Sequence, residues 1–318
     1  MKAIAAPPGH RTDGLFRKGK IRKAFTGQLE YLLLILPCIV FYVLFAYMPM
    51  YGAVIAFKDF QLGDTIRSAP WVGFRWFKEF FSSFYFWRLI KNTIVLNLYQ
   101  LLFGFPAPIL FALVVNEIRL RKFKRTLQTI SYMPYFISTV VIVGMLNNFF
   151  GAQHGIINNL LEALGHDRIN FAMQARYFRP LYVGSGIWQG FGYGSVIYIA
   201  AMSGVDVNLH EAAVIDGATR LQRIWHITLP AIKPTIMILL ILNVGHMMSV
   251  GFEKIILMYN PAVYETADVI STYIFRRGLL GAEYSFSTAI GLFNSVINCA
   301  LLVAVNALSK RMNGTSLW

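Results

Sequence analysis

The chain has 318 residues, of which 56% are hydrophobic and 14% are charged, and its formal net charge is +14. Globular domains carry about 25% charged residues, so this composition, together with a mean hydropathy of +0.53, excludes a water-soluble enzyme and a disordered protein. It indicates an integral membrane protein. The two cysteines, Cys38 and Cys299, lie in apolar runs and predict neither a disulfide framework nor a metal site.

The N-terminal residues 1–30 are predicted to form a basic tail beside the membrane. They are polar, and the apolar run that follows is long, so we expect no cleavable signal peptide. Gly14, Gly19 and Lys20 have the spacing of a phosphate-binding loop, but Ile21 stands where Ser or Thr must bind magnesium. We therefore expect no nucleotide site in this chain.

The rest of the chain predicts an all-α, polytopic membrane protein with six transmembrane helices. About 20 helical residues cross a hydrocarbon core of about 30 Å, and lipid requires the backbone to be paired internally. The transmembrane domain covers 31–308, followed by a C-terminal tail, 309–318. Its six apolar stretches lie at about 31–50, 94–115, 126–150, 180–203, 234–257 and 286–308.

The basic residues predict the orientation of these spans. Of the 29 Lys and Arg residues, 17 lie in the N-terminal tail, the second-to-third loop, the fourth-to-fifth loop and the C-terminal tail. Lys and Arg accumulate on the cytoplasmic side, so we expect both termini in the cytoplasm. The positive charge is then explained by the orientation of the helices in the membrane and by contact of the N-terminal tail with membrane lipid. We therefore expect no nucleic-acid partner.

The loop 204–233, between the fourth and fifth spans, predicts two short helices around a glycine. Asn208 is expected to cap the first helix, with Glu211 at the third helical position. Gly217 suits the left-handed residue that ends this helix, and the second helix is expected near 218–227. Such a surface element of small residues fits a docking site. An amphipathic hairpin lying on lipid is the alternative.

The same loop resembles the EAA loop of permeases of bacterial binding-protein-dependent ABC importers. A glutamate and two alanines precede the glycine by a fixed spacing, and a Leu-Pro pair follows it. One departure is Ile224, where such loops often carry an aromatic residue, which Trp225 next to it can supply. The residues that match the pattern and are expected to couple to an ATPase are Glu211, Ala212, Ala213, Asp216, Gly217, Ala218, Leu229 and Pro230.

A second stretch, 47–59, resembles the exit of the first helix in polysaccharide-type sugar permeases, a branch of the maltose-like group. Within that branch, the sequence is similar to permeases of alginate-oligosaccharide importers. The resemblance implies the type I permease fold of ABC importers and a place in the bacterial inner membrane. It also implies a transport subunit that binds no cofactor and is not itself an enzyme.

Several partners are implied by the same resemblance. They are a second permease subunit, expected to be a different homologous chain, and two cytoplasmic ATPase subunits that bind ATP and Mg²⁺. A periplasmic solute-binding protein would deliver the oligosaccharide. ATP hydrolysis on the ATPase subunits would drive transport through the EAA loop.

The substrate path is predicted where polar and aromatic side chains lie at the middle of the fourth and fifth spans, because such groups are unfavourable in lipid. Gln189 and Tyr193 share one helix face, and maltose-type permeases contact sugar on the same two stretches. The alternative for each polar residue is a hydrogen bond between helices. The residues expected on the path are Gly186, Trp188, Gln189, Gly190, Tyr193, Asn243, His246 and Met247, the last three on a common face.

The sequence fits two other classes of membrane protein less well. A secondary transporter or channel would need intramembrane Asp or Glu for ion coupling, and the centres of the six stretches contain neither. A membrane-bound enzyme would need a catalytic cluster, which the sequence does not offer. We therefore expect an oligosaccharide permease, whose substrate can be an acidic sugar such as an alginate oligosaccharide.

Overall fold

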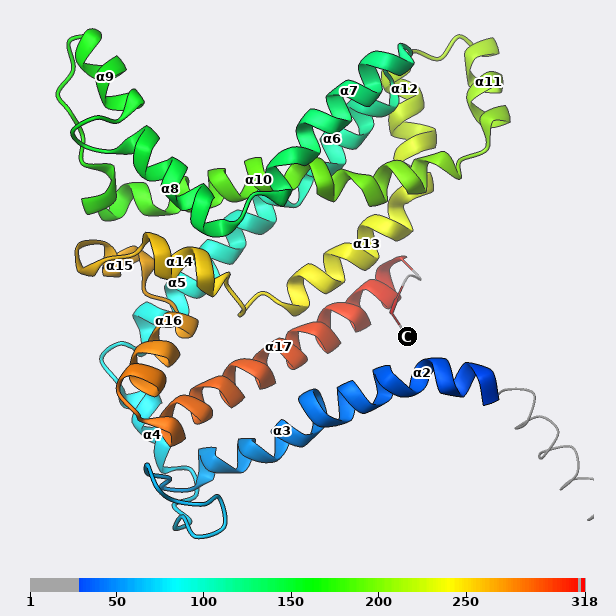
Figure 1. Cartoon of the computed structure of the whole chain (residues 1–318). Coiled ribbons are helices and arrows are strands. Elements are labelled where there is room, and N and C mark those ends of the chain that lie inside the picture. The colour runs from blue at the N-terminus through cyan, green and yellow to red at the C-terminus, as the bar shows by residue number, and fades with distance from the viewer. Residues whose placement is uncertain (1–28, 314–315, 318) are drawn as a thin grey trace, which may run out of the picture. The chain divides into compact units, whose positions relative to one another are not determined.

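The computed structural model describes residues 29–313 and 316–317, so the basic segment 14–23 lies outside it. All regular elements of the described residues are helices, as predicted, and Lys58 and Trp71 form one isolated β-bridge. The α-helices, drawn in Figure 1, are α2 (Leu29–Tyr42), α3 (Met48–Met50), α4 (Arg75–Ser82), α5 (Phe86–Tyr99), α6 (Pro106–Asn116), α7 (Arg121–Tyr132), α8 (Thr139–Phe150), α9 (Ile156–Ala163), α10 (Ala175–Ser203), α11 (Val207–Ile215), α12 (Arg220–Arg223), α13 (Leu229–Gly245), α14 (Phe252–Met258), α15 (Tyr264–Ala267), α16 (Ile270–Ile274) and α17 (Tyr284–Asn313).

Short turns of other helical types link several of these helices. The π-helical turns are Val43–Tyr47, Gln100–Gly104, Ile224–Thr228 and Phe275–Leu280. The 3₁₀ turns are Tyr51–Phe57, Met133–Phe136, Phe171–Met173 and Pro261–Val263. The described residues up to Val54 and those from Ile55 onward form separate compact units.

In the first unit, the described residues are almost wholly apolar helix. The large side chains of Leu34 and Phe45 are 75% and 68% exposed. A helix that is apolar on all sides is suited to lipid rather than water.

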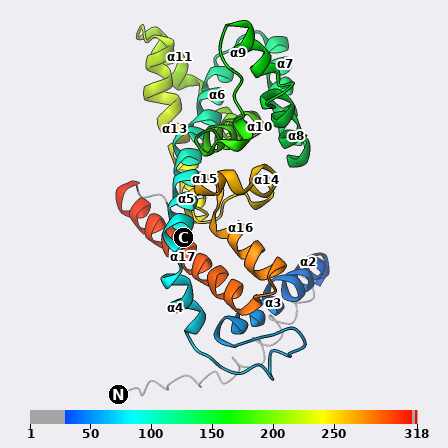
Figure 2. The same ribbon diagram turned by 90° about the vertical axis from the view of Figure 1, so that its left-hand side faces the viewer.

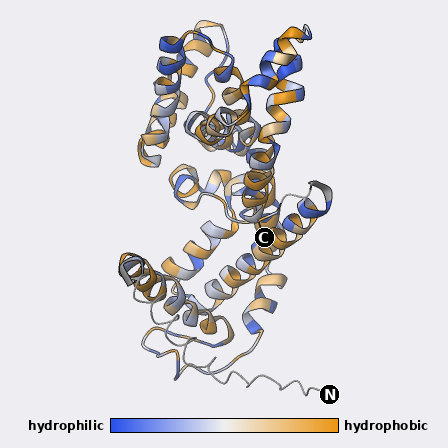
Figure 3. Ribbon diagram, turned by 90° about the vertical axis from the view of Figure 1, so that its right-hand side faces the viewer, coloured by the Kyte–Doolittle hydropathy of each residue, from blue (hydrophilic) through white to orange (hydrophobic). Residues whose placement is uncertain are grey.

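Within the described residues, four helices are long and apolar enough to cross a membrane, namely Leu33–Phe57, Phe86–Asn116, Arg220–Gly245 and Tyr284–Arg311. A fifth is added if the bent pair Arg121–Phe136 and Thr139–Phe150 is one span. Helix α10 has 29 residues but is not among them, because its glycines and polar side chains lower its hydropathy. Six spans and the side of the termini therefore remain predictions. Orange, apolar stretches run along most of the helices in Figure 3.

The stretch 126–150 is not one straight helix, contrary to the prediction. The two parts meet at an angle of 98°. Ile137 and Ser138 are extended, and the Ser138 side chain accepts a hydrogen bond from the backbone N–H of Val141 at the start of α8. A serine cap of this kind begins a new helix, and Pro134 in the turn before it lacks the N–H that a continuous helix would use.

The stretch 234–257 is also interrupted, so the predicted continuous fifth helix is wrong. Helix α13 ends at Gly245 and α14 begins only at Phe252. The intervening backbone is held by α17, where the Asn298 side chain accepts a hydrogen bond of 2.9 Å from the N–H of Met248. A Cβ on Gly245 would lie 2.6 Å from Cδ1 of Leu302, so α17 approaches α13 closely at this glycine.

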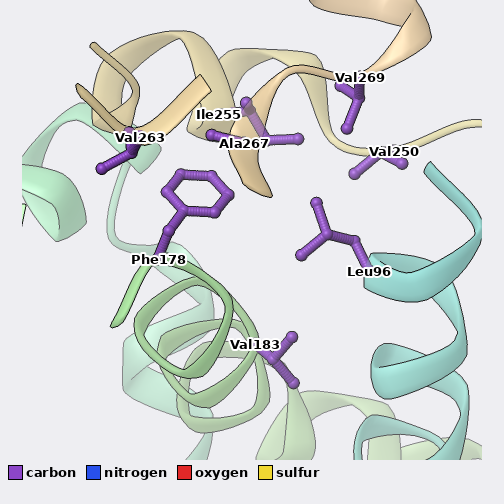
Figure 4. Close-up of a cluster of buried hydrophobic side chains, with 8 residues drawn as sticks. All are labelled: Leu96, Phe178, Val183, Val250, Ile255, Val263, Ala267 and Val269. Carbon is purple, nitrogen blue, oxygen red and sulfur yellow. The ribbon is translucent and has the colours of Figure 1, made fainter. Parts of the chain in front are cut away.

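The second unit is held together by packing between helices that are distant in sequence. Helix α10 packs against α6, and α13 runs beside α17 (Figure 1). Figure 2 shows α14 and α15 between α10 and α16. A buried apolar cluster joins α5, α10 and α14, and Figure 4 shows the ring of Phe178 pointing from α10 towards Ile255 and Val263. Burial of such side chains fixes where α14 lies.

A buried carboxylate adds a polar tie between the same elements. Asp268 is fully buried and forms ion pairs with Arg88 of α5 at 3.1 Å and with Arg276 at 2.8 Å. Asn92 of α5 donates hydrogen bonds to the carbonyls of Glu265 and Asp268. A buried charge needs such partners, so these contacts hold the segment after α14 against α5.

Candidate coupling and transport sites

The expected coupling segment is an exposed helix, α11. Its cap is Asp206, whose side chain accepts a hydrogen bond of 2.9 Å from the N–H of Asn208. The prediction that Asn208 is the cap is therefore wrong. Both residue types cap well, but the chain enters the helix two residues earlier than the local pattern suggested. No residue of α11 is buried, and Ile215 is 86% exposed. An apolar side chain left this open marks a surface for a partner or for lipid.

Gly217 ends α11 in the way the sequence predicted. Its φ is +79°, in the left-handed region that glycine adopts without strain. The N–H of Ala218 donates to the carbonyl of Ala213 at 2.8 Å, and the N–H of Gly217 donates to the carbonyl of Val214 at 3.1 Å. These two bonds form a Schellman motif, so the end of the helix is sharply defined.

The second helix of the loop continues without a break into α13. Thr219 and Gln222 form a reciprocal capping box at its start. The π-helical turn Ile224–Thr228 then leads into α13, where the N–H of Leu229 bonds to the carbonyl of Ile224. Pro230 follows and has no N–H to donate, which accounts for the local change of helix type. Movement of the loop would thus act directly on a membrane helix.

A hollow of about 350 Å³ lies between the two helices of the loop. Four of the predicted coupling residues line it, whereas Glu211 and Ala212 are exposed on α11. Leu229 and Pro230 belong to the start of α13. The lining residues are Ala213, Asp216, Gly217, Ala218, Gln222, Arg223, His226 and Ile227.

Among the predicted path residues, Gln189 and Tyr193 lie on one face of α10 and contact the bend between α7 and α8. The Gln189 side chain donates a hydrogen bond of 3.0 Å to the carbonyl of Ile137. The Tyr193 ring stacks on Tyr135, with centroids 4.1 Å apart and planes 12° apart. Tyr193 remains 43% exposed. The shared face is as predicted, and both residues also take part in helix packing.

The other predicted residues of α10 point in different directions. Trp188 lines an apolar pocket of about 460 Å³ with residues of α8. Gly186 faces α14 and the π-helical turn after α5, because a Cβ there would lie 3.5 Å from Oε1 of Gln100 and 3.6 Å from Nζ of Lys254. Nothing lies within 4 Å of a Cβ on Gly190. The structure therefore does not gather these positions on one surface.

The cluster predicted on the fifth span is not formed as expected. The Asn243 side chain donates a hydrogen bond of 2.8 Å to Leu239 within its own helix. His246 and Met247 lie beyond the end of α13, in the turn that interrupts the span. Because the helix stops at Gly245, the three residues do not share a helical face.

Comparison with known proteins identifies the family. The model of the binding-protein-dependent transport system inner membrane component matches residues 104–314. The chain belongs to this family. Protein LplB of Bacillus subtilis is 41% identical to this permease over 286 residues, which are 90% of each chain. The polygalacturonan/rhamnogalacturonan transport system permease protein YteP of the same species is 40% identical over 307 residues, or 96% of each chain.

Solved structures agree with these relatives. The permease matches a crystal structure of a bacterial ABC transporter involved in the import of the acidic polysaccharide alginate, with a TM-score of 0.86 and 44% identity over 92% of this chain and 99% of the other. A second match, with a TM-score of 0.86 and 43% identity over 93% and 99%, is a bacterial alginate ABC transporter in complex with an alginate pentasaccharide-bound periplasmic protein. The predicted ABC permease fold and the resemblance on which it rested are confirmed.

Proposed function

We propose that this permease moves an acidic oligosaccharide across the bacterial inner membrane as one subunit of an ABC importer. The observation that carries the proposal is the likeness, over more than nine-tenths of the chain, to an importer of the acidic polysaccharide alginate. YteP, a polygalacturonan/rhamnogalacturonan transport system permease protein, is also similar to nearly the whole chain. Polymers of sugar acids are thus the substrate class named for both.

The coupling proposal concerns α11 and the hollow beside it. One of two cytoplasmic ATPase subunits, which bind ATP and Mg²⁺, docks on the exposed surface around Glu211 and Ala212, and the other docks on the second permease. Support comes from the unburied helix and its sharply defined end at Gly217. The unbroken helix from Arg220 to Gly245 would carry the movement into the membrane. In this arrangement both termini are cytoplasmic, and a second, homologous permease completes the transport pathway.

The transport proposal places Tyr193 and Gln189 beside the sugar path, at the bend between α7 and α8. A ring that is partly exposed and already stacked on another aromatic offers a flat face for a sugar. A periplasmic binding protein delivers the substrate to the outer end of this path.

Uptake into proteoliposomes tests the function. The permease is purified with its partner permease and ATPase subunits, and labelled alginate oligosaccharide is supplied with the binding protein. We expect uptake that requires internal ATP and the binding protein. Uptake driven by an ion gradient without ATP would instead support a secondary transporter. Uptake of neutral oligosaccharides alone would contradict the proposed substrate class.

A further inference from the structure

Lys254 of α14 is a buried cation without an acidic partner. Its exposed fraction is 9%, and it forms none of the ion pairs found among the described residues. Its ammonium group donates one hydrogen bond, of 3.2 Å, to the carbonyl of Tyr182, and it lies 5.3 Å from the centroid of the Tyr182 ring. An ammonium carries three donors, so most of its bonding capacity is unused.

Lys254 lies beside a buried apolar cluster. Its neighbour Ile255 is fully buried in the cluster shown in Figure 4, and Tyr182 and Ile187 of α10 pack against that cluster. Removing a charge from water is unfavourable unless an opposite charge compensates it. A neutral side chain could donate the same bond to Tyr182 at a smaller desolvation penalty. Helix packing alone therefore does not account for a lysine at this position.

A second polar group faces the same place. The amide oxygen Oε1 and the amide nitrogen Nε2 of Gln100, and Nζ of Lys254, all lie within 4 Å of the position that a Cβ on Gly186 would occupy. No hydrogen bond to the Gln100 side chain occurs within the described part of the chain. Gln100 begins a π-helical turn, a type of helix irregularity that is frequent at functional sites. An amide donor and an ammonium donor thus converge over a glycine, from three different helices.

We propose that Lys254, with Gln100, binds a carboxylate of the transported sugar over Gly186. The ammonium would form a charge-assisted hydrogen bond to one carboxylate oxygen, and the Gln100 amide would donate to the carboxylate beside it. Because Gly186 has no Cβ, the position between the two side chains is left unfilled. This site rests on the proposed function and would explain its substrate specificity. Within the transport path, the permease would select acidic over neutral sugar units.

The test uses the complete transporter in detergent, without the binding protein. Binding of an alginate oligosaccharide is compared with binding of the same oligosaccharide after its carboxyl groups have been reduced to alcohols. Lys254→Met should weaken binding of the acidic ligand at least tenfold and leave binding of the reduced ligand within twofold of wild type. Lys254→Arg should retain the preference for the acid, and Gln100→Leu should reduce it.

Lys91→Met is the matched control, because Lys91 is an exposed lysine of α5. It should leave both affinities unchanged. Equal weakening of both ligands by Lys254→Met, or loss of assembly with the ATPase subunits, would assign the lysine to packing and overturn the proposal. Unchanged binding of the acid would do the same. A wild-type transporter that neither binds nor takes up the acidic oligosaccharide would refute the proposed function itself.

Discussion

Replacement of Gly217 by valine should weaken the docking of the ATPase subunit on α11 and so lower both ATP hydrolysis and transport. The residue has a φ of +79°, and nothing lies within 4 Å of a Cβ placed there. The Cβ of valine would therefore meet no neighbour, and the expected effect is backbone strain. The left-handed conformation costs an ordinary L-residue about 1–2 kcal/mol, and a β-branched residue more.

That strain acts on the Schellman motif at the end of α11. If the backbone relaxes to negative φ, the bond of 2.8 Å from Ala218 to Ala213 and the bond of 3.1 Å from Gly217 to Val214 are lost. A difference of about 1.4 kcal/mol changes an equilibrium tenfold. We therefore expect the docking-competent end of α11 to be populated about 5- to 30-fold less, and sugar-stimulated ATPase activity and uptake to fall correspondingly.

The assay is ATPase activity and uptake by the reconstituted complex in the presence of sugar-loaded binding protein. Gly217→Asn should remain close to wild type, because asparagine tolerates the left-handed region. Gly165→Val places the same strain at another open position, where φ is +80°, and should leave coupling intact. Wild-type rates for Gly217→Val, or an equal loss for Gly165→Val, would refute the reasoning.

Three further substitutions test the rest of the structure. Tyr193→Ala should raise the half-saturation concentration for uptake, because one hydrogen-bonding or stacking group contributes on the order of 1–3 kcal/mol to sugar binding. Tyr193→Phe should stay closer to wild type, since it retains the ring. If uptake falls only in proportion to the ATPase subunit lost in a pull-down, Tyr193 acts in helix packing instead. Gly192→Val should lower the melting temperature in detergent, since a Cβ there would lie 1.9 Å from the carbonyl oxygen of Ser131, while Gly190→Ala has open space and should be tolerated. Asp268→Asn should destabilise the fold by about 3 kcal/mol, because Arg88 and Arg276 lose their buried counter-charge. As a control, Glu162→Gln breaks an exposed ion pair with Arg168 and should change stability by less than about 1 kcal/mol. Equal melting temperatures for the two variants would contradict the stabilising role of Asp268.

The sequence alone determined the features that depend on neighbouring residues. Apolar stretches of twenty residues predict membrane helices, because hydropathy sums along the chain. The left-handed end of α11 at Gly217 was predictable because the preference of glycine for positive φ is local. The spacing of the coupling residues was sufficient to identify the family, which the comparisons confirm.

Only the tertiary structure decided where those helices stop and which polar groups meet. The break after Gly245 depends on Asn298 and Leu302 of α17, and no local signal near residue 245 predicts what a helix fifty residues later will contact. The pairing of Asp268 with Arg88 likewise spans 180 residues. Whether a lysine is solvated or buried depends on the elements folded around it, so the approach of Lys254 to Gln100 and Gly186 could not be predicted from their positions in the chain.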